Sequence, residues 1–167
     1  MTNLINDNYS FNYAELAGIE LIHNQTEYDD MIINAKLARL AADDNTKTFD
    51  MYVYLAESKY FLDRGQELAR NKADMLNKRK QQLNREIAQI EKTDAPVSPV
   101  GTPSEVTQRK KQWKEEQIRK AQKSCEEDSK EITEHYDLLI AQCHQQKEEA
   151  DHKFEQSKNQ RGQTKLQ

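Results

Sequence analysis

The stretch "TDAPVSPVGTPSE", residues 93–105, decides how this chain folds. It contains all three prolines of the 167-residue sequence and one of its four glycines. Proline lacks a backbone N–H and disfavours helix in the residue before it. We therefore expect helix to end near Lys92 and to resume at Pro103, with Thr102 as the N-cap and Glu105 completing a capping box.

The segments on both sides have the composition and period of long helices. Residues 47–92 repeat an apolar residue at every seventh position, as coiled coils do. This row is Leu55, Leu62, Ala69, Leu76, Leu83 and Ile90, and a second row beside it is Tyr54, Phe61, Leu68 and Met75. Residues 105–158 contain neither proline nor glycine and carry a less regular apolar row, from Val106 to Phe154. Two such helices joined by a short loop predict an antiparallel hairpin.

Two shorter amphipathic segments precede the long helices. Residues 11–22 and 26–42 both show the helical period, the second with Thr26 as its cap. The apolar stripe of the long helices widens at residues 54–60 and 137–143, which we expect to lie at the same level. We expect the N-terminal segments to cover this wide stripe in a four-helix head, with a second copy of the chain as the alternative cover.

The sequence thus predicts an all-α fold: a long antiparallel coiled-coil helical hairpin with short N-terminal helices packed on its base. The base would form a small helical-bundle head, and the rest of the hairpin an arm. The expected order is N-terminal helices, long helix, proline-rich loop, long helix and flexible tail, at residues 1–46, 47–92, 93–104, 105–158 and 159–167.

Composition restricts the class of protein. Charged residues make up 32% of the chain and hydrophobic ones 35%, with a mean hydropathy of −1.07. This is too polar for a compact globule and suits a thin helical fold. The first basic residue is Lys36 and no apolar run has membrane-spanning length, so we expect neither a signal peptide nor a transmembrane segment.

The two cysteines predict a reducing compartment. Cys125 and Cys143 lie on one predicted helix, roughly 27 Å apart along its axis, which is too far for a disulfide. Reduced thiols are typical of the cytoplasm, or of the host cytosol if the protein is viral or delivered.

Charge is sorted along the chain. The net charge is −4, which argues against a general nucleic-acid binder. Residues 78–123, however, carry 12 basic and 6 acidic side chains, whereas residues 1–50 and 124–158 are each −6. We expect the basic runs 77–85 and 109–114 to meet at the distal end of the hairpin. A segregated field of this kind steers a partner of opposite sign.

The distal end is therefore the predicted docking surface for an acidic protein partner. Nucleic acid or an anionic membrane surface is the alternative partner, and a homodimer remains open. Trp113 is either a seam residue, seven positions after Val106, or an aromatic anchor for the partner. The candidate partner-binding residues are Lys78, Arg79, Lys80, Arg85, Arg109, Lys110, Lys111, Trp113 and Lys114.

The sequence offers no catalytic, cofactor or metal motif. Its cysteines and histidines are scattered along one helix and do not form the paired spacings of a zinc site, and a slender hairpin has no substrate cleft. We therefore expect no small-molecule substrate and a non-enzymatic protein–protein interaction module: an adaptor, an assembly scaffold, or a stalk-like or chaperone-like component of a complex. Ser98 and Thr102 each precede proline and are predicted phosphorylation sites.

Overall fold

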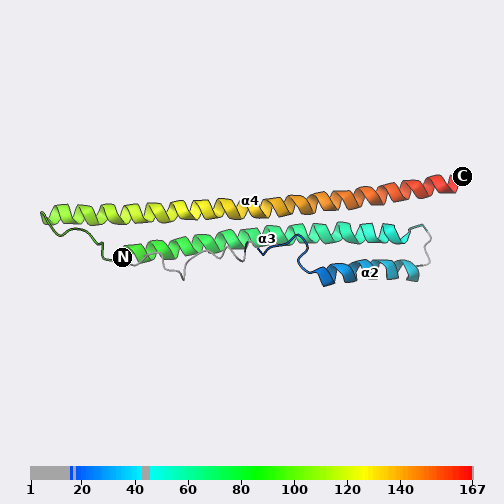
Figure 1. Cartoon of the computed structure of the whole chain (residues 1–167), viewed down its shortest axis with the longest axis horizontal. Helices are drawn as coiled ribbons and strands as arrows, with labels where there is room; N and C mark the ends of the chain where they lie inside the picture. Colours follow the sequence, from blue (N-terminus) through cyan, green and yellow to red (C-terminus); the bar gives the residue numbers. More distant parts are fainter. Residues whose placement is uncertain (1–15, 17, 43–45, 167) are drawn as a thin grey trace. The chain divides into compact units, whose positions relative to one another are not determined.

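The computed structural model describes residues 16, 18–42 and 46–166, with side chains up to residue 159. Within these residues the chain is all-α and contains no strand, which confirms the predicted class. The helices are α2 (Gln25–Ala41), α3 (Phe49–Lys92) and α4 (Pro103–Leu166) (Figure 1). Contacts divide the chain into two compact units: the loop unit, residues 1–17 and 72–134, and the α2 unit, residues 18–71 and 135–167.

The loop unit is an antiparallel helical hairpin, as predicted. Arg79 of α3 contacts Asp128 of α4, and nearer the loop Lys114 donates to the backbone carbonyl of Glu91. α4 therefore begins about ten residues before the level at which α3 ends, and the loop runs back beside its first turns (Figure 1). The buried apolar side chains of this unit are Leu16, Met75, Ile90, Ala95, Ala121, Cys125 and Ile132.

The overhang of α4 shifts the pairing of the two helices. In the α2 unit, Ser58 donates a hydrogen bond to Asp151, and Gly65 lies beside Cys143. The prediction that residues 54–60 and 137–143 share a level is therefore wrong by about three helical turns. A tight turn had been assumed, whereas the loop lies along α4 before the chain enters it.

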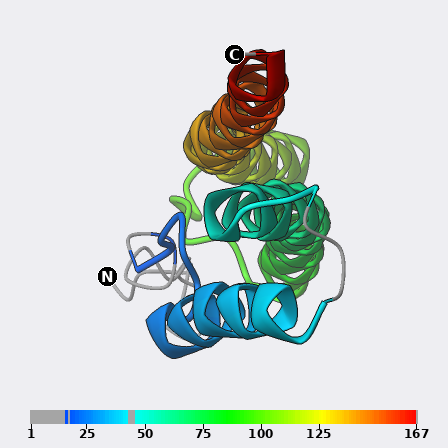
Figure 2. The ribbon, with the colours of Figure 1, turned by 90° about the vertical axis from the view of Figure 1, so that its right-hand side faces the viewer.

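α2 covers α3 on the side remote from α4, so that α3 lies between the other two helices of this unit (Figures 1 and 2). The Tyr28 hydroxyl donates to the Glu57 carboxylate at 3.2 Å, and the Tyr28 ring packs edge-on against Tyr60 and beside Phe61. Burial and the Glu57 carboxylate raise the pKa of Tyr28 to about 12. An N-terminal helix therefore covers the wide stripe of α3, as expected.

The seam of α3 follows the predicted first row only at its end, where Ile90 is buried, and not in its first turns. Leu55 and Leu62 of the first row are 41% and 45% exposed, whereas Phe61 and Leu68 of the second row are 5% and 0% exposed. The second row offers larger side chains here, and aromatic residues remove more apolar surface from water. On α4 the prediction is confirmed, because Ala121, Cys125, Ile132, Tyr136, Leu139, Cys143 and Ala150 are all buried.

The N-terminal part differs from the expectation in two ways. The cap of α2 is Asn24, not Thr26, since the Asn24 side chain accepts from the Glu27 N–H at 3.2 Å. Residues 18–22 are not helical. The Arg64 guanidinium donates hydrogen bonds to the backbone carbonyls of Glu20 and Leu21 there. The rest of the helix expected at residues 11–22 lies outside the described residues, apart from Leu16.

Two further expectations change with the helix boundaries. The four-helix head becomes, among the described residues, an arrangement of three helical segments in the α2 unit. α4 continues through Leu166, where a flexible tail had been expected from residue 159. No proline interrupts these last residues, and most of them are good helix formers.

Candidate docking surface at the loop end

The loop is held in one conformation by Arg109. Its guanidinium donates from Nη2 to the carbonyl of Ser98 at 2.9 Å and also to the carbonyl of Val100. The Ser98 hydroxyl accepts from the Val100 N–H at 3.3 Å. These bonds satisfy polar backbone groups of the loop that have no hydrogen-bond partner in a helix or strand. Val100, with 74% of its surface exposed, is presented at the tip of an ordered loop.

The junction of the loop with α4 confirms the predicted capping box. The Thr102 hydroxyl accepts from the Glu105 N–H at 3.2 Å, and the Glu105 carboxylate accepts from the Thr102 N–H at 3.3 Å. Gly101 precedes it with a φ of +114°, in the region that favours glycine. A Cβ at this position would also collide with the Glu105 carboxylate. The capping box and Gly101 therefore depend on each other.

The lysines at this end have different environments. Lys114 donates to the Glu91 carbonyl at 2.8 Å, in the last turn of α3, where carbonyls lack helical partners. Lys110 lies 3.7 Å from the carboxylate of Asp94, but both groups are solvated and the pair is weak. Lys111 is exposed. Lys110 and Lys111 thus remain accessible to a partner at this end, and Lys92, the last residue of α3, is exposed there as well.

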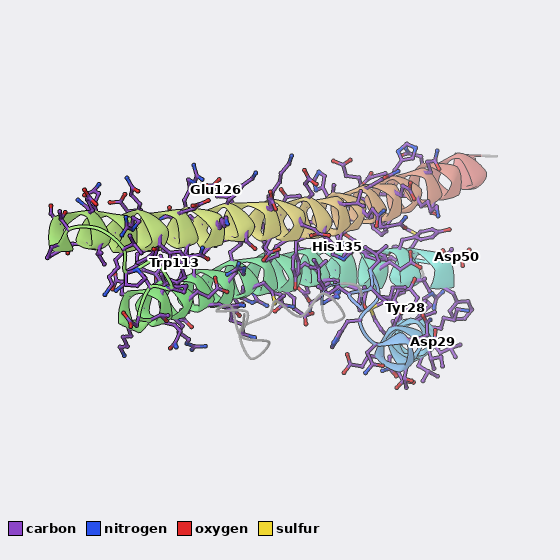
Figure 3. The ribbon with its side chains drawn as sticks, turned by 60° about the vertical axis from the view of Figure 1, so that its left-hand side comes forward. Tyr28, Asp29, Asp50, Trp113, Glu126 and His135 are labelled. Atoms are coloured by element: carbon purple, nitrogen blue, oxygen red, sulfur yellow. The ribbon has the colours of Figure 1, made fainter. Side chains whose placement is uncertain are left out.

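A shallow groove of about 430 Å³ lies between the loop and the first turns of α4. Ala95 and Ile118 give it an apolar floor, and the stems of Lys110 and Lys111 form part of its wall. Trp113 is half-buried, on the side of α4 that faces α3 and the loop (Figure 3). This position agrees better with the predicted seam residue than with an exposed aromatic anchor.

The predicted basic cluster is divided in two. Arg79 is level with Asp128 and Glu91 is level with Lys114, so twelve residues of α3, roughly 18 Å, separate the two levels. Lys78 and Lys80 flank Arg79 and share their level with the acidic run 126–128. Charges farther apart than the Debye length of about 8–10 Å are largely screened. The exposed Lys78 and Lys80 therefore do not extend the loop-end surface, whereas Arg85 lies midway, six residues of α3 before Glu91.

Arg79 is not a docking residue, which corrects the sequence prediction. Its side chain is 2% exposed, and its Nε donates to Asp128 Oδ2 at 2.7 Å. Glu86 is also buried, with Oε1 lying 3.8 Å from Arg79 Nη1 and accepting from Gln82 at 3.4 Å. The second apolar row ends at Met75, and beyond it Arg79 and Glu86 continue the buried side of α3 as far as Ile90.

This buried group carries one cation and two carboxyl groups. Burial raises the pKa of Glu86; Arg79 opposes this effect and Asp128 adds to it. Glu86 Oε2 and Arg79 Nη1 are buried with no hydrogen-bond partner. Taking ions out of water is unfavourable unless each is well paired. The group therefore constrains how α3 and α4 align more than it adds to stability.

The candidate modification sites both lie on the accessible loop. Ser98 and Thr102 are exposed, but their hydroxyls already accept backbone hydrogen bonds from Val100 and Glu105. The sequence did not predict a role for Asp94, which lines the groove, or for Val100, which lies at the loop tip. The signal for Val100 was present, since an aliphatic residue between two prolines and a glycine is placed at a loop tip.

The structure supplies little reactive chemistry. Cys125 and Cys143 are free and buried, and burial raises the pKa of the Cys143 thiol, with Arg64 opposing it. A buried thiol with a raised pKa is a poor nucleophile. In the part of the chain that the structure describes, no three His, Cys, Asp or Glu side chains converge as metal ligands.

None of the described helices combines the length and the apolar character needed to cross a membrane. Comparisons with family models, curated protein sequences and solved structures found no match to this chain.

Proposed function

We propose that this protein is a non-enzymatic interaction module, an adaptor or scaffold-type component, that docks an acidic protein surface through its loop end. The loop-end surface consists of Val100, Lys110 and Lys111. The observation that supports this most is the fixed presentation of Val100, which Arg109 holds in place from α4. An exposed aliphatic side chain at the loop tip, together with two accessible cations in the first turns of α4, fits a partner pocket with an acidic rim.

Pre-organisation is the physical reason for favouring this surface. A loop that is already ordered loses less conformational entropy on binding than a mobile one. Lys110 and Lys111 would steer an acidic partner and select against basic ones, while Val100 would supply the desolvated contact. Arg109 and Lys114 act indirectly, by holding the loop and the end of α3.

A cross-linking experiment tests the proposal. A photoreactive amino acid replaces Val100 in the full chain, and the peptides captured in cells are identified by mass spectrometry. Lys110→Glu with Lys111→Glu should abolish capture of acidic peptides. The control is Lys78→Glu with Lys80→Glu, which makes the same change of charge in the same unit, at the level of Asp128 and so about 26 Å farther along α4. Equal loss in both variants would show that net charge, not this surface, governs binding.

Nucleic acid or anionic lipid is the alternative partner, because Lys110 and Lys111 are consecutive, exposed cations on one helix. A single-stranded oligonucleotide and phosphatidylserine vesicles are the probes. Binding to nucleic acid should weaken steeply between about 50 and 200 mM salt. If the native chain binds such a probe and the Lys110→Glu and Lys111→Glu variant does not, the partner is a polyanion and not an acidic protein.

The proposal includes a reducing, cytosol-like compartment. Cys125 and Cys143 are both free, and neither has the other as a disulfide partner. Such unpaired buried thiols are common where glutathione and thioredoxin keep cysteines reduced.

A further inference from the structure

α2 is apolar on two opposite faces. Its inner face carries Tyr28, Ile32 and Ala35, which are half-buried toward α3. Its outer face carries Ile33, Leu37 and Leu40, which are 54%, 55% and 67% exposed. These three residues are spaced at i, i+4 and i+7, the period of a continuous stripe on one side of a helix. A helix apolar on both faces normally has a neighbour on each.

No described segment covers this outer face. α2 lies on α3 at the side remote from α4, so among the described residues α3 is the only helix that α2 contacts (Figures 1 and 2). Not one residue of α2 is buried. The stripe of Ile33, Leu37 and Leu40 therefore remains available to a partner.

The charges around the stripe indicate what kind of partner fits. Glu27, Asp29 and Asp30 lie within the first two turns of α2, just before Ile33 on the chain. Asp29 accepts a hydrogen bond from Gln25 at 2.9 Å, and no described cation forms an ion pair with Glu27, Asp29 or Asp30. Tyr28 points to α3, whereas Asp29 lies farther round the helix (Figure 3). Lys36, three residues after Ile33 and four before Leu40, is an exposed cation at the flank of the stripe. The apolar stripe thus has an acidic end and one flanking cation.

We propose that the outer face of α2 binds a basic amphipathic helix of another protein. Three aliphatic side chains of that helix would pack on Ile33, Leu37 and Leu40. Its lysines or arginines, about one turn farther along, would meet Asp29 and Asp30. Recognition of an amphipathic helix by an apolar stripe with a charged end is a common binding mode. This surface is separate from the loop end and does not depend on the function proposed there.

A second copy of the chain fits this face less well. Two-fold contact between the apolar stripes requires Leu37 of each copy to lie near Leu37 of the other. In a parallel pair, Asp30 would meet Asp30. In an antiparallel pair, Asp30 lies seven residues before Leu37 and would fall beyond Ala41, the last residue of the opposite α2. Centred on Leu37, neither arrangement supplies a cation to Asp30. An antiparallel pair centred on Ile33 would bring Lys36 to Asp30, but it would place Leu37 and Leu40 opposite Asp29 and Thr26. A basic helix can cover the stripe and also supply cations to the carboxylates.

Alkylation of a thiol placed on the stripe tests the proposal. The Leu37→Cys variant of the full chain is treated with a maleimide, which Cys125 and Cys143 resist because they are buried. The probe is a helical peptide with leucines at i, i+4 and i+7 and lysines beside them; its control replaces lysine by glutamate. We expect the lysine peptide to slow alkylation about tenfold and the glutamate peptide to have no effect. Leu138→Cys, at an exposed position of α4, should be unaffected by either peptide.

The carboxylates are tested in the same assay. Asp29→Asn with Asp30→Asn, made in the Leu37→Cys chain, should remove most of the protection by the lysine peptide. Glu126→Gln with Glu127→Gln, the same change on α4, should leave it intact. Equal protection by both peptides would overturn the basic partner. Slow alkylation without peptide would show that the chain covers its own stripe. Protection that rises with protein concentration, together with a doubled mass, would show that a second copy covers it. Either result overturns the proposal.

Discussion

Arg79 and Asp128 form a buried ion pair between α3 and α4 of the loop unit, with Arg79 Nε 2.7 Å from Asp128 Oδ2. Removing Arg79 takes away the cation that faces two buried carboxyl groups, and breaking a buried ion pair costs about 3–5 kcal/mol. Arg79→Met should lower the free energy of unfolding by about this amount. Trp113, the only tryptophan, reports the unfolding of this unit by its fluorescence in urea.

The double variant separates charge from packing. Arg79→Met with Asp128→Leu replaces both ions by apolar side chains and should recover much of the lost stability, since such replacements are often neutral or stabilising. If Arg79→Met alone unfolds like the native chain, water solvates the pair and the interior of the unit is wetter than the structure indicates.

Glu86 predicts a pH dependence. Burial raises its pKa in the folded chain, against the opposing effect of Arg79, so the folded state binds this proton more tightly than the unfolded state. The resulting stabilisation is complete below the unfolded pKa, about 4.3, and is lost as pH rises through the higher folded value. Glu86→Gln, which carries no charge, should therefore become more stable than the native chain as pH increases from acid to neutral.

Urea titrations at several pH values, followed by Trp113 fluorescence, measure this difference. Glu126→Gln removes a carboxylate from an exposed position of the same unit and should show no comparable trend. A constant difference between Glu86→Gln and the native chain at all pH values would contradict a raised pKa.

Local signals on the chain predicted the loop and its caps, because each depends on neighbours within a few residues. The three prolines, Gly101 and the pair Thr102 and Glu105 specify where α4 begins whatever surrounds it. The class of fold followed from the same stretch and from the heptad period. These features required no knowledge of which helix faces meet.

The alignment of α3 with α4 could not be predicted in the same way. It depends on the path of the loop along α4, and the choice between the rows of Leu62 and Phe61 depends on that alignment. Arg79 was assigned to the docking surface because charged residues are rarely buried without a partner. The partner of Arg79, Asp128, lies 49 positions away in the sequence and can be identified only once the helices are aligned.

Removing the guanidinium of Arg109 should make the loop mobile. Arg109→Leu loses the hydrogen bonds to the carbonyls of Ser98 and Val100 while it retains an aliphatic stem. A protease that cleaves beside aliphatic residues should then cut at Val100 several-fold faster, because ordered loops resist cleavage. Arg119→Leu, at an exposed position of α4, is the control. Equal cleavage of all three chains would mean that the prolines alone order the loop.

Gly101 should tolerate no side chain. At a φ of +114° a Cβ is strained, and it would displace the Glu105 carboxylate from the Thr102 N–H. Gly101→Ala should reduce the free energy of unfolding of the loop unit by about 1–3 kcal/mol. Ser104→Ala, in the first turn of α4, should change it far less. A neutral Gly101→Ala would show that the loop has a second acceptable conformation.

Replacing Gly65 by alanine should have the opposite effect and stabilise the chain. It lies in the interior of α3, where glycine is about 1 kcal/mol less favourable than alanine. A Cβ there would stand 3.5 Å from Cys143 Cβ, an ordinary van der Waals contact. Gly65→Ala should therefore raise the stability of the α2 unit by about 0.5–1 kcal/mol. Circular dichroism in urea measures this gain, and the alkylation rate of Cys143 should fall with it. A loss of stability would instead place α3 and α4 closer together at this point than an added methyl group permits.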